Sequence, residues 1–156
     1  MWLDIDWLTW ETVFVGPGGP DGAEVANFTF RNNHPRFQYI PSWSTKEYTD
    51  GKEINGTSSY TTDSDASVQF TFESDAVGLY GSVNGSFSAS VDGKNPSTLT
   101  SAYNASAYQQ LLYYTDGLGG GPHTLTIANT PKSTFAVDFA RTWTAQGGSQ
   151  PGTPTR

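Results

Sequence analysis

The sequence predicts an all-β protein with a jelly-roll β-sandwich fold, built as a single domain. Short runs of alternating apolar and polar residues recur along the 156-residue chain, and a strand with that period buries one face and exposes the other. Six Asn-Gly or Asp-Gly dipeptides separate the runs and favour the tight turns of hairpins. No segment carries a sustained helical stripe, so many short strands at this spacing indicate a sandwich rather than an α/β fold.

The N-terminal segment, residues 1–24, is the hardest to assign. Its apolar residues alternate with Asp4 and Asp6, as in a strand, but several of them also lie at helical spacing. The β-branched and aromatic residues of Thr12-Val13-Phe14-Val15 favour an extended segment, which can supply an edge strand.

The sandwich domain is predicted to span residues 25–144. Its strand-like runs lie at residues 25–30, 37–40, 67–73, 76–80, 86–91, 108–114, 121–127 and 134–139. Residues 145–156 contain no bulky apolar side chain whose burial could offset the entropy of ordering, so we expect a flexible tail or linker there.

Composition excludes several classes of partner. The formal net charge is -7 and the eight Lys and Arg residues are scattered, so the chain repels phosphate backbones and nucleic acid is excluded as the main partner. No cysteine is present, which excludes a disulfide framework and thiolate metal sites. No apolar run approaches about 20 residues, so we expect no membrane insertion by this segment.

The composition also favours an extracellular or cell-surface location. Charged residues make up only 15% of the chain, while Ser, Thr and aromatic residues are abundant, as in extracellular β proteins. The N-terminus does not have the pattern of a secretory signal peptide, because acids interrupt its apolar residues and no basic residue precedes them. We therefore expect a secreted protein whose signal peptide is absent from this sequence.

Several motifs of the predicted sandwich occur in a characteristic order. They are Phe37-Gln38-Tyr39 with Trp43, Thr57-Ser58-Ser59-Tyr60-Thr61, Val68-Gln69-Phe70-Thr71-Phe72, Ala76-Val77-Gly78-Leu79-Tyr80-Gly81, Ser90-Val91-Asp92-Gly93, Tyr108-Gln109-Gln110-Leu111-Leu112-Tyr113, Gly117-Leu118, His123-Thr124-Leu125-Thr126-Ile127 and Val137-Asp138-Phe139. Over residues 25–143 this order resembles the galactose-binding-like jelly-roll ectodomains of fungal cell-surface proteins. The resemblance implies a secreted β-sandwich related to carbohydrate-binding modules, and it implies no particular activity.

Catalytic residues are not evident in the sequence. His123 begins a strand-like run after Gly-Gly-Pro, where a structural role in the turn is favoured over a catalytic one. No Gly-x-Ser-x-Gly elbow is present to hold a nucleophile. The acid pairs Asp63 with Asp65 and Glu73 with Asp75 lie at strand ends among Ser and Thr, where we interpret them as solvated turn acids. The sequence therefore predicts no enzyme activity and no catalytic residue.

Aromatic residues near loops are the candidates for ligand binding. A sugar site needs an exposed aromatic plane for the C–H face of a pyranose and polar groups for its hydroxyls. Trp43, Tyr48 and Tyr60 meet this requirement best, since they flank Gly- and Ser-rich loops with Asp50 and Asn55 nearby. The alternative for each ring is a place in the core of the sandwich.

Oxygen ligands for calcium form a second candidate site. Asp4, Asp6, Glu11 and Asp138 carry the carboxylates that Ca²⁺ takes, and Asp138 lies within the last strand-like run. We expect no cofactor to be required, but a structural calcium ion could bind at these residues. In the alternative reading, Asp138 faces solvent or accepts hydrogen bonds from the backbone.

The sequence also contains candidate sites for N-glycosylation. Four acceptor sequons begin at Asn27, Asn55, Asn84 and Asn104, in agreement with secretion. A glycan on Asn55 or Asn104 would partly cover the loops that we favour for sugar binding.

These observations lead to three functional hypotheses. The leading one is a non-catalytic, extracellular, lectin-like module that binds a glycan or cell-wall polysaccharide through Trp43, Tyr48 and Tyr60. The alternative is a structural or adhesive cell-surface ectodomain that uses an exposed patch at Trp2, Trp7 and Trp10. A glycoside hydrolase or lyase is the least favoured, because no pair of carboxylates facing a cleft is apparent.

Overall fold

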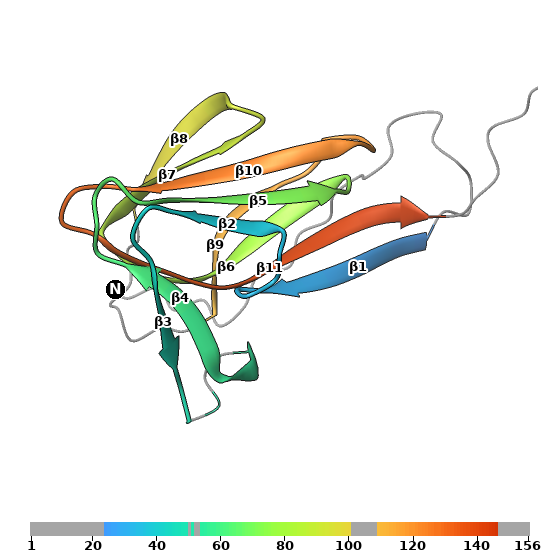
Figure 1. The fold of residues 1–156 in the computed structure, drawn as a ribbon. Coiled ribbons are helices and arrows are strands. Elements are labelled where there is room, and N and C mark those ends of the chain that lie inside the picture. The colour runs from blue at the N-terminus through green and yellow to red at the C-terminus, as the bar shows by residue number, and fades with distance from the viewer. Residues whose placement is uncertain (1–23, 50, 52–53, 101–108, 147–156) are drawn as a thin grey trace, which may run out of the picture.

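Two antiparallel sheets form the protein, as the computed structural model of the chain shows (Figure 1). The structure describes residues 24–49, 51, 54–100 and 109–146. The prediction of an all-β sandwich is confirmed. Within the described residues no helix has the length and the hydropathy that crossing a lipid bilayer requires.

The first sheet has the strand order β3-β4-β11-β6-β9, with β1 also paired to β11. Its strands are β1 (Glu24–Arg31), β3 (Ser44–Glu47), β4 (Thr57–Thr61), β6 (Ala76–Asn84), β9 (Gln110–Thr115) and β11 (Thr134–Gln146). A short 3-10 helix, η1 (Ile54–Gly56), precedes β4.

The second sheet has the strand order β2-β5-β10-β7-β8. Its strands are β2 (Phe37–Ile40), β5 (Ser67–Glu73), β7 (Ser86–Val91), β8 (Lys94–Thr100) and β10 (Pro122–Asn129). In Figure 1 the layer that holds β5 and β10 lies over the layer that holds β1 and β11.

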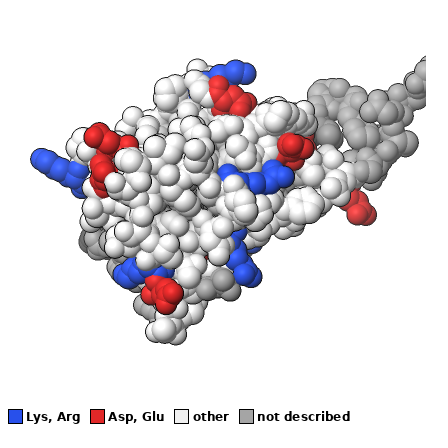
Figure 2. Space-filling view, in the orientation of Figure 1, with Lys and Arg blue, Asp and Glu red and all other residues white. Residues whose placement is uncertain are grey.

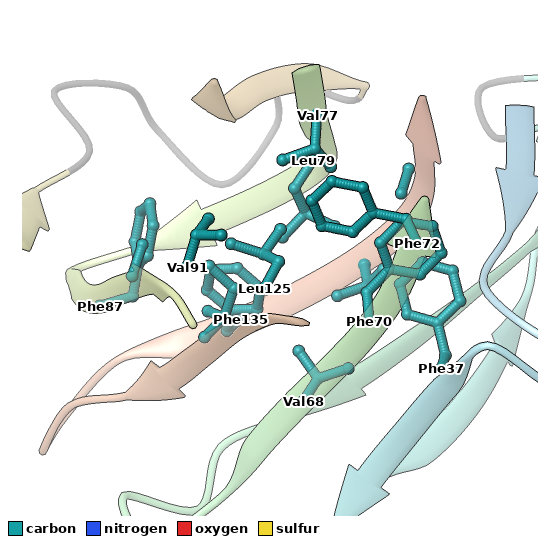
Figure 3. Close-up of a cluster of buried hydrophobic side chains, with 14 of the residues drawn as sticks. Phe37, Val68, Phe70, Phe72, Val77, Leu79, Phe87, Val91, Leu125 and Phe135 are labelled. Atoms are coloured by element: carbon teal, nitrogen blue, oxygen red, sulfur yellow. The ribbon is translucent and has the colours of Figure 1, made fainter. Parts of the chain in front are cut away.

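The core fills the space between the two sheets. Alternate side chains of β5 and β10 are fully buried there, as the period of two requires, among them Phe70, Phe72 and Leu125. Figure 3 shows these side chains together with Phe135, which enters the same cluster from β11 in the opposite sheet.

Three strands were not expected from the sequence. β3 and β8 lie at the edges of their sheets and carry polar, mostly exposed side chains, apart from Leu99 of β8, which packs against the core. β4 is polar as well, but its Ser58, Ser59 and Thr61 are buried. An alternation of apolar and polar residues cannot reveal strands of this composition.

The described strands extend slightly beyond the predicted limits of the sandwich. β1 begins at Glu24 and β11 ends at Gln146, so residues 145 and 146 belong to a strand rather than to the tail. The predicted N-terminal segment up to residue 23, with Trp2, Trp7 and Trp10, and the remaining tail from residue 147 lie outside the described residues.

A β-bulge at Asp138 divides the longest strand into two parts. The register of β11 against β6 shifts between Val137 and Phe139. Before the bulge Val137 points into the core, whereas after it Ala140 does so and Phe139 turns to the outer face, where its ring stacks on Tyr80. The same edge of β11 therefore pairs with β4 before the bulge and with β1 after it.

Candidate functional site

A groove lies on the outer face of the first sheet. Tyr60 of β4, Ala136 of β11 and Ser82 of β6 are direct neighbours across the sheet. Their side chains point away from the core, because the flanking Phe135 and Val137 point into it. The groove has a volume of about 340 Å³ and is lined by Lys46, Tyr48, Tyr60, Ser82, Val83, Asn84, Thr134 and Ala136.

Small side chains form the floor of this groove and aromatic rings form its walls. The floor at Ala136 and Ser82 is low because neither residue extends far from the sheet. The Tyr48 backbone is fixed by η1, since its N–H donates to the Gly56 carbonyl over 2.7 Å. The Lys46 ammonium lies 4.9 Å from the centroid of the Tyr48 ring, a cation–π distance.

A second pocket lies on the other side of Tyr60. Its volume is about 250 Å³, and it is lined by Ser42, Trp43, Ser44, Tyr60, Thr61, Thr62 and Asp63. Hydroxyl groups dominate the lining, and Asp63 supplies the carboxylate. One oxygen of Asp63, Oδ1, accepts a hydrogen bond from the Asp65 N–H over 2.9 Å. Tyr60 contributes to both pockets.

Trp43 belongs partly to the core and partly to the second pocket. Its Nε1–H donates to the Ser67 carbonyl over 3.0 Å, and its ring lies edge-on to Phe135 at a centroid distance of 6.3 Å. The ring is half-buried and packs against the hydrophobic cluster. Trp43 therefore closes one edge of the core and offers only part of its surface to a ligand.

The structure brings the three aromatic residues predicted for ligand binding to these two pockets. Tyr48 and Tyr60 line the groove, while Trp43 and Tyr60 line the second pocket. Asn55 lies in η1, whereas Asp50 falls outside the described residues.

Other aromatic residues on the same outer face were missed by the sequence analysis. The Tyr80 and Phe139 rings stack with a centroid distance of 4.4 Å, and the Arg141 guanidinium lies over both. A Cβ at Gly78 would lie 3.2 Å from ring atoms of Trp143 and of Tyr80, so glycine leaves room for both rings on the strand. Gly78 inside a strand was the sequence signal for such a close approach.

The structure places His123 in a turn. Its Nδ1 lies 2.8 Å from Asp92 Oδ2, and its Nε2 lies 3.0 Å from the Gly119 carbonyl oxygen. Burial lowers the pKa of His123, but the hydrogen bonds to Asp92 and Gly119 outweigh it and raise this pKa above its ordinary value. The hydrogen bond from His123, with a further one from the Thr124 N–H, lowers the pKa of Asp92.

The two acid pairs also have local structural partners. Asp65 and Asp63 are joined in a turn by the hydrogen bond described above. Asp75 Oδ2 accepts hydrogen bonds from Thr144 Oγ1 at 2.8 Å and from the Ala145 N–H at 3.0 Å, which secures the last part of β11.

Asp138 is the buried acid of the first sheet. It is 0% exposed, and the Ile54 N–H donates to Oδ1 and Oδ2 over 3.1 Å each. The other proposed calcium ligands, Asp4, Asp6 and Glu11, lie outside the described residues. In the part of the chain that the structure describes, no three His, Asp or Glu residues gather as metal ligands would. Calcium binding stays a prediction.

The glycosylation sequons occupy different surroundings. Asn27 is exposed in β1, and Asn84 is exposed at the end of β6, where it lines the groove. Asn55 lies in η1, and Asn104 lies outside the described residues. Glycosylation at all four positions stays a prediction.

Comparison with known proteins places the fold among carbohydrate-active proteins. No protein-family model matches the chain. A protein of Flavonifractor plautii named A type blood N-acetyl-alpha-D-galactosamine deacetylase is 39% identical over 129 residues. That similarity covers 72% of this chain but only 16% of the relative, so the chain spans a small part of the relative's length.

Solved structures with the same fold come from carbohydrate-active enzymes. A family two carbohydrate esterase from Cellvibrio japonicus superposes with a TM-score of 0.59 at 13% identity, over 85% of this chain and 38% of the esterase. An exo-beta-1,3-galactanase from Phanerochaete chrysosporium superposes with a TM-score of 0.58 at 12% identity, over 74% of this chain and 29% of the galactanase. At these identities the likeness shows a shared fold.

The prediction of a non-catalytic, lectin-like module without enzyme activity is wrong. The relative that aligns with 72% of this chain is named a deacetylase, and this finding contradicts the prediction. The adhesive-ectodomain alternative is set aside for the same reason. The prediction failed because it relied on missing catalytic motifs, and a chain that aligns with 16% of its relative cannot show the relative's motifs in full.

Proposed function

We propose that this chain is part of a carbohydrate-active enzyme and that its groove binds the glycan substrate. The observation that carries the proposal is the outer groove, where Tyr48 and Tyr60 lie beside the polar side chains of Lys46, Ser82, Asn84 and Thr134. We propose the removal of an N-acetyl group from an amino sugar as the reaction, and the similarity to the Flavonifractor plautii deacetylase supports this choice.

The groove has the chemistry that recognises a sugar. A tyrosine ring offers a π-face to the C–H bonds of a pyranose, and its hydroxyl can both donate and accept hydrogen bonds. Lys46 donates, while Asn84, Ser82 and Thr134 can both donate and accept, so they match the mixed donors and acceptors of sugar hydroxyls and of an acetamido group.

The groove residues bind and orient the substrate in this proposal. In deacetylation, water adds to the amide carbonyl, the C–N bond breaks, and acetate and a free amine leave. Among the described groove residues there is no carboxylate or histidine to take the proton of that water. We therefore assign these residues to substrate positioning, a role worth several orders of magnitude when the reacting atoms are held in register.

Other parts of the sequence-based interpretation remain proposals. An extracellular or cell-surface location, a fungal source and descent from galactose-binding-like domains agree with a glycan substrate but rest on the sequence alone. The structural neighbours share the fold and are carbohydrate-active enzymes, which agrees with a glycan ligand.

The test measures glycan binding and acetate release by the purified chain. The probe is the type A blood-group trisaccharide, and the variants are Tyr60→Ala and Lys46→Gln. We expect Tyr60→Ala to weaken binding about tenfold, because one aromatic contact is lost. Tyr80→Ala is the matched control, since Tyr80 lies on the same outer face but does not line the groove.

Each outcome of this experiment decides one part of the proposal. Acetate release that falls together with affinity in Tyr60→Ala supports both the substrate and the site. Equal binding by wild type and Tyr60→Ala would remove the groove as the site, and no binding of the trisaccharide by the wild type would contradict the glycan substrate.

A further inference from the structure

We propose that the substrate is an extended glycan whose sugar units occupy both pockets and cross Tyr60. This inference rests on the proposed function and deepens it, because it names the substrate class as an oligosaccharide rather than a single terminal sugar. The side chain that the two pockets share is the starting observation.

The two pockets follow each other along strand β3. Ser44 pairs with Tyr60 and lines the second pocket, while Lys46, two residues further on, lines the groove. Residues i and i+2 of a strand share a face and lie about 7 Å apart. That spacing is comparable with the length of one hexopyranose unit, so two neighbouring sugar units of one oligosaccharide can reach both pockets.

Each pocket alone is small for an enclosed ligand. Pockets that enclose a small molecule begin at about 300 Å³; the groove, at about 340 Å³, lies just above this limit, and the second pocket, at about 250 Å³, lies below it. A ligand that uses both pockets contacts the shared Tyr60 ring together with Tyr48 on one side and Trp43 on the other. Two small adjacent pockets suit an oligosaccharide better than a single enclosed sugar.

Opposite charges distinguish the two ends of this extended site. Lys46 is the cation in the groove, and Asp63 is the anion in the second pocket. Among the described residues Asp63 Oδ1 accepts the Asp65 N–H, whereas Oδ2 accepts no hydrogen bond. A carboxylate oxygen accepts hydrogen bonds from sugar hydroxyls, so Asp63 can bind the hydroxyl groups of a sugar unit in the second pocket.

The experiment compares ligands of increasing length on the purified chain. The probes are N-acetyl-α-D-galactosamine and the type A blood-group trisaccharide and tetrasaccharide, with dissociation constants measured by calorimetry. We expect the affinity to rise at least tenfold from the monosaccharide to the tetrasaccharide. Asp63→Asn keeps the oxygen that accepts the Asp65 N–H but removes the charge, and we expect it to abolish this rise.

Asp65→Asn is the matched control, because Asp65 is exposed and does not line the second pocket. Equal affinity for all three probes, with binding still sensitive to Tyr60→Ala, would overturn the extended site and leave the proposed function intact. A length-dependent rise that survives in Asp63→Asn would place the added units elsewhere and overturn this inference. No binding of any probe would overturn both proposals.

Discussion

His123 is held between two groups that can only accept hydrogen bonds. Asp92 Oδ2 and the Gly119 carbonyl each lie within hydrogen-bond distance of one ring nitrogen. Both nitrogens can donate at once only in the imidazolium form, so the geometry favours the protonated ring. The pKa of His123 is raised above its ordinary value, which also favours the protonated ring.

The contacts of His123 with Asp92 and Gly119, called the His123 clamp below, predict that stability depends on pH. The ordinary pKa of His123 is 6.5, and its folded pKa is higher, so its contribution is complete below 6.5 and is lost as the pH rises through the folded value. Asp92 has the opposite sign: its contribution is present above the ordinary pKa of 3.8 and is lost as the pH falls through the lowered folded value. The His123 side chain is 13% exposed and the Asp92 side chain 33% exposed, so solvent screens the pair in part and we expect an effect of about 1 kcal/mol or less.

Chemical denaturation between about pH 5 and about pH 9 measures this effect. His123→Gln should flatten the decline of the unfolding free energy toward high pH. His34→Gln serves as the control, because the only other histidine contacts a backbone N–H rather than an acid. An unchanged pH slope in His123→Gln would show that the clamp does not contribute.

At the scale of elements, the bulge in β11 organises the first sheet. The strand meets β4 through Phe135–Val137 and β1 through Phe139–Gln146, and Asp138 stands where one partner gives way to the other. Its backbone carbonyl accepts from the Asn32 N–H over 2.8 Å, and its side chain accepts from η1. Asp138 of β11 therefore links η1 and the turn that follows β1.

Replacing this residue should destabilise the sheet. In Asp138→Ala the Ile54 N–H loses its acceptor, and we expect the free energy of unfolding to fall by about 1–3 kcal/mol. Asp138→Asn retains one side-chain oxygen and should lose less. Urea denaturation gives both values, with the exposed Asp65→Asn as control. Wild-type stability in Asp138→Ala would contradict the linking role.

At the scale of the whole molecule, aromatic packing joins the two sheets. Phe135 in β11 is 0% exposed and meets the Phe87 ring of β7, in the other sheet, at a centroid distance of 5.0 Å. Figure 2 shows the charged side chains scattered over the visible face rather than gathered in one patch.

Truncation of Phe135 should therefore weaken the molecule as one unit. We expect Phe135→Ala to lower the free energy of unfolding by about 3–5 kcal/mol, because the ring leaves a cavity between the sheets. Phe28→Ala is the control: Phe28 is 47% exposed, and its loss should change stability by less than about 1 kcal/mol. Thermal denaturation followed by circular dichroism compares them. Equal losses in the two variants would contradict a core that depends on Phe135.

Part of the candidate site could be predicted from the sequence. Tyr48 and Tyr60 stood out because aromatic rings beside polar loops suit a sugar. The rest of the groove, including Ser82 and Ala136, could not be predicted, because small residues in a strand carry no functional signal. The prediction of no enzyme activity failed for a different reason, since it was drawn from the absence of motifs.

The sequence by itself determined the sandwich, its central strands and two of the groove residues. The alternation in β5 and β10 is a local property, because each side chain's face follows from its position along its own strand. Only the tertiary structure decided the edge strand β3, the bulge at Asp138 and the row Tyr60–Ala136–Ser82. These features depend on pairing between strands that lie far apart in the chain. The local pattern of a strand does not specify which strand it pairs with.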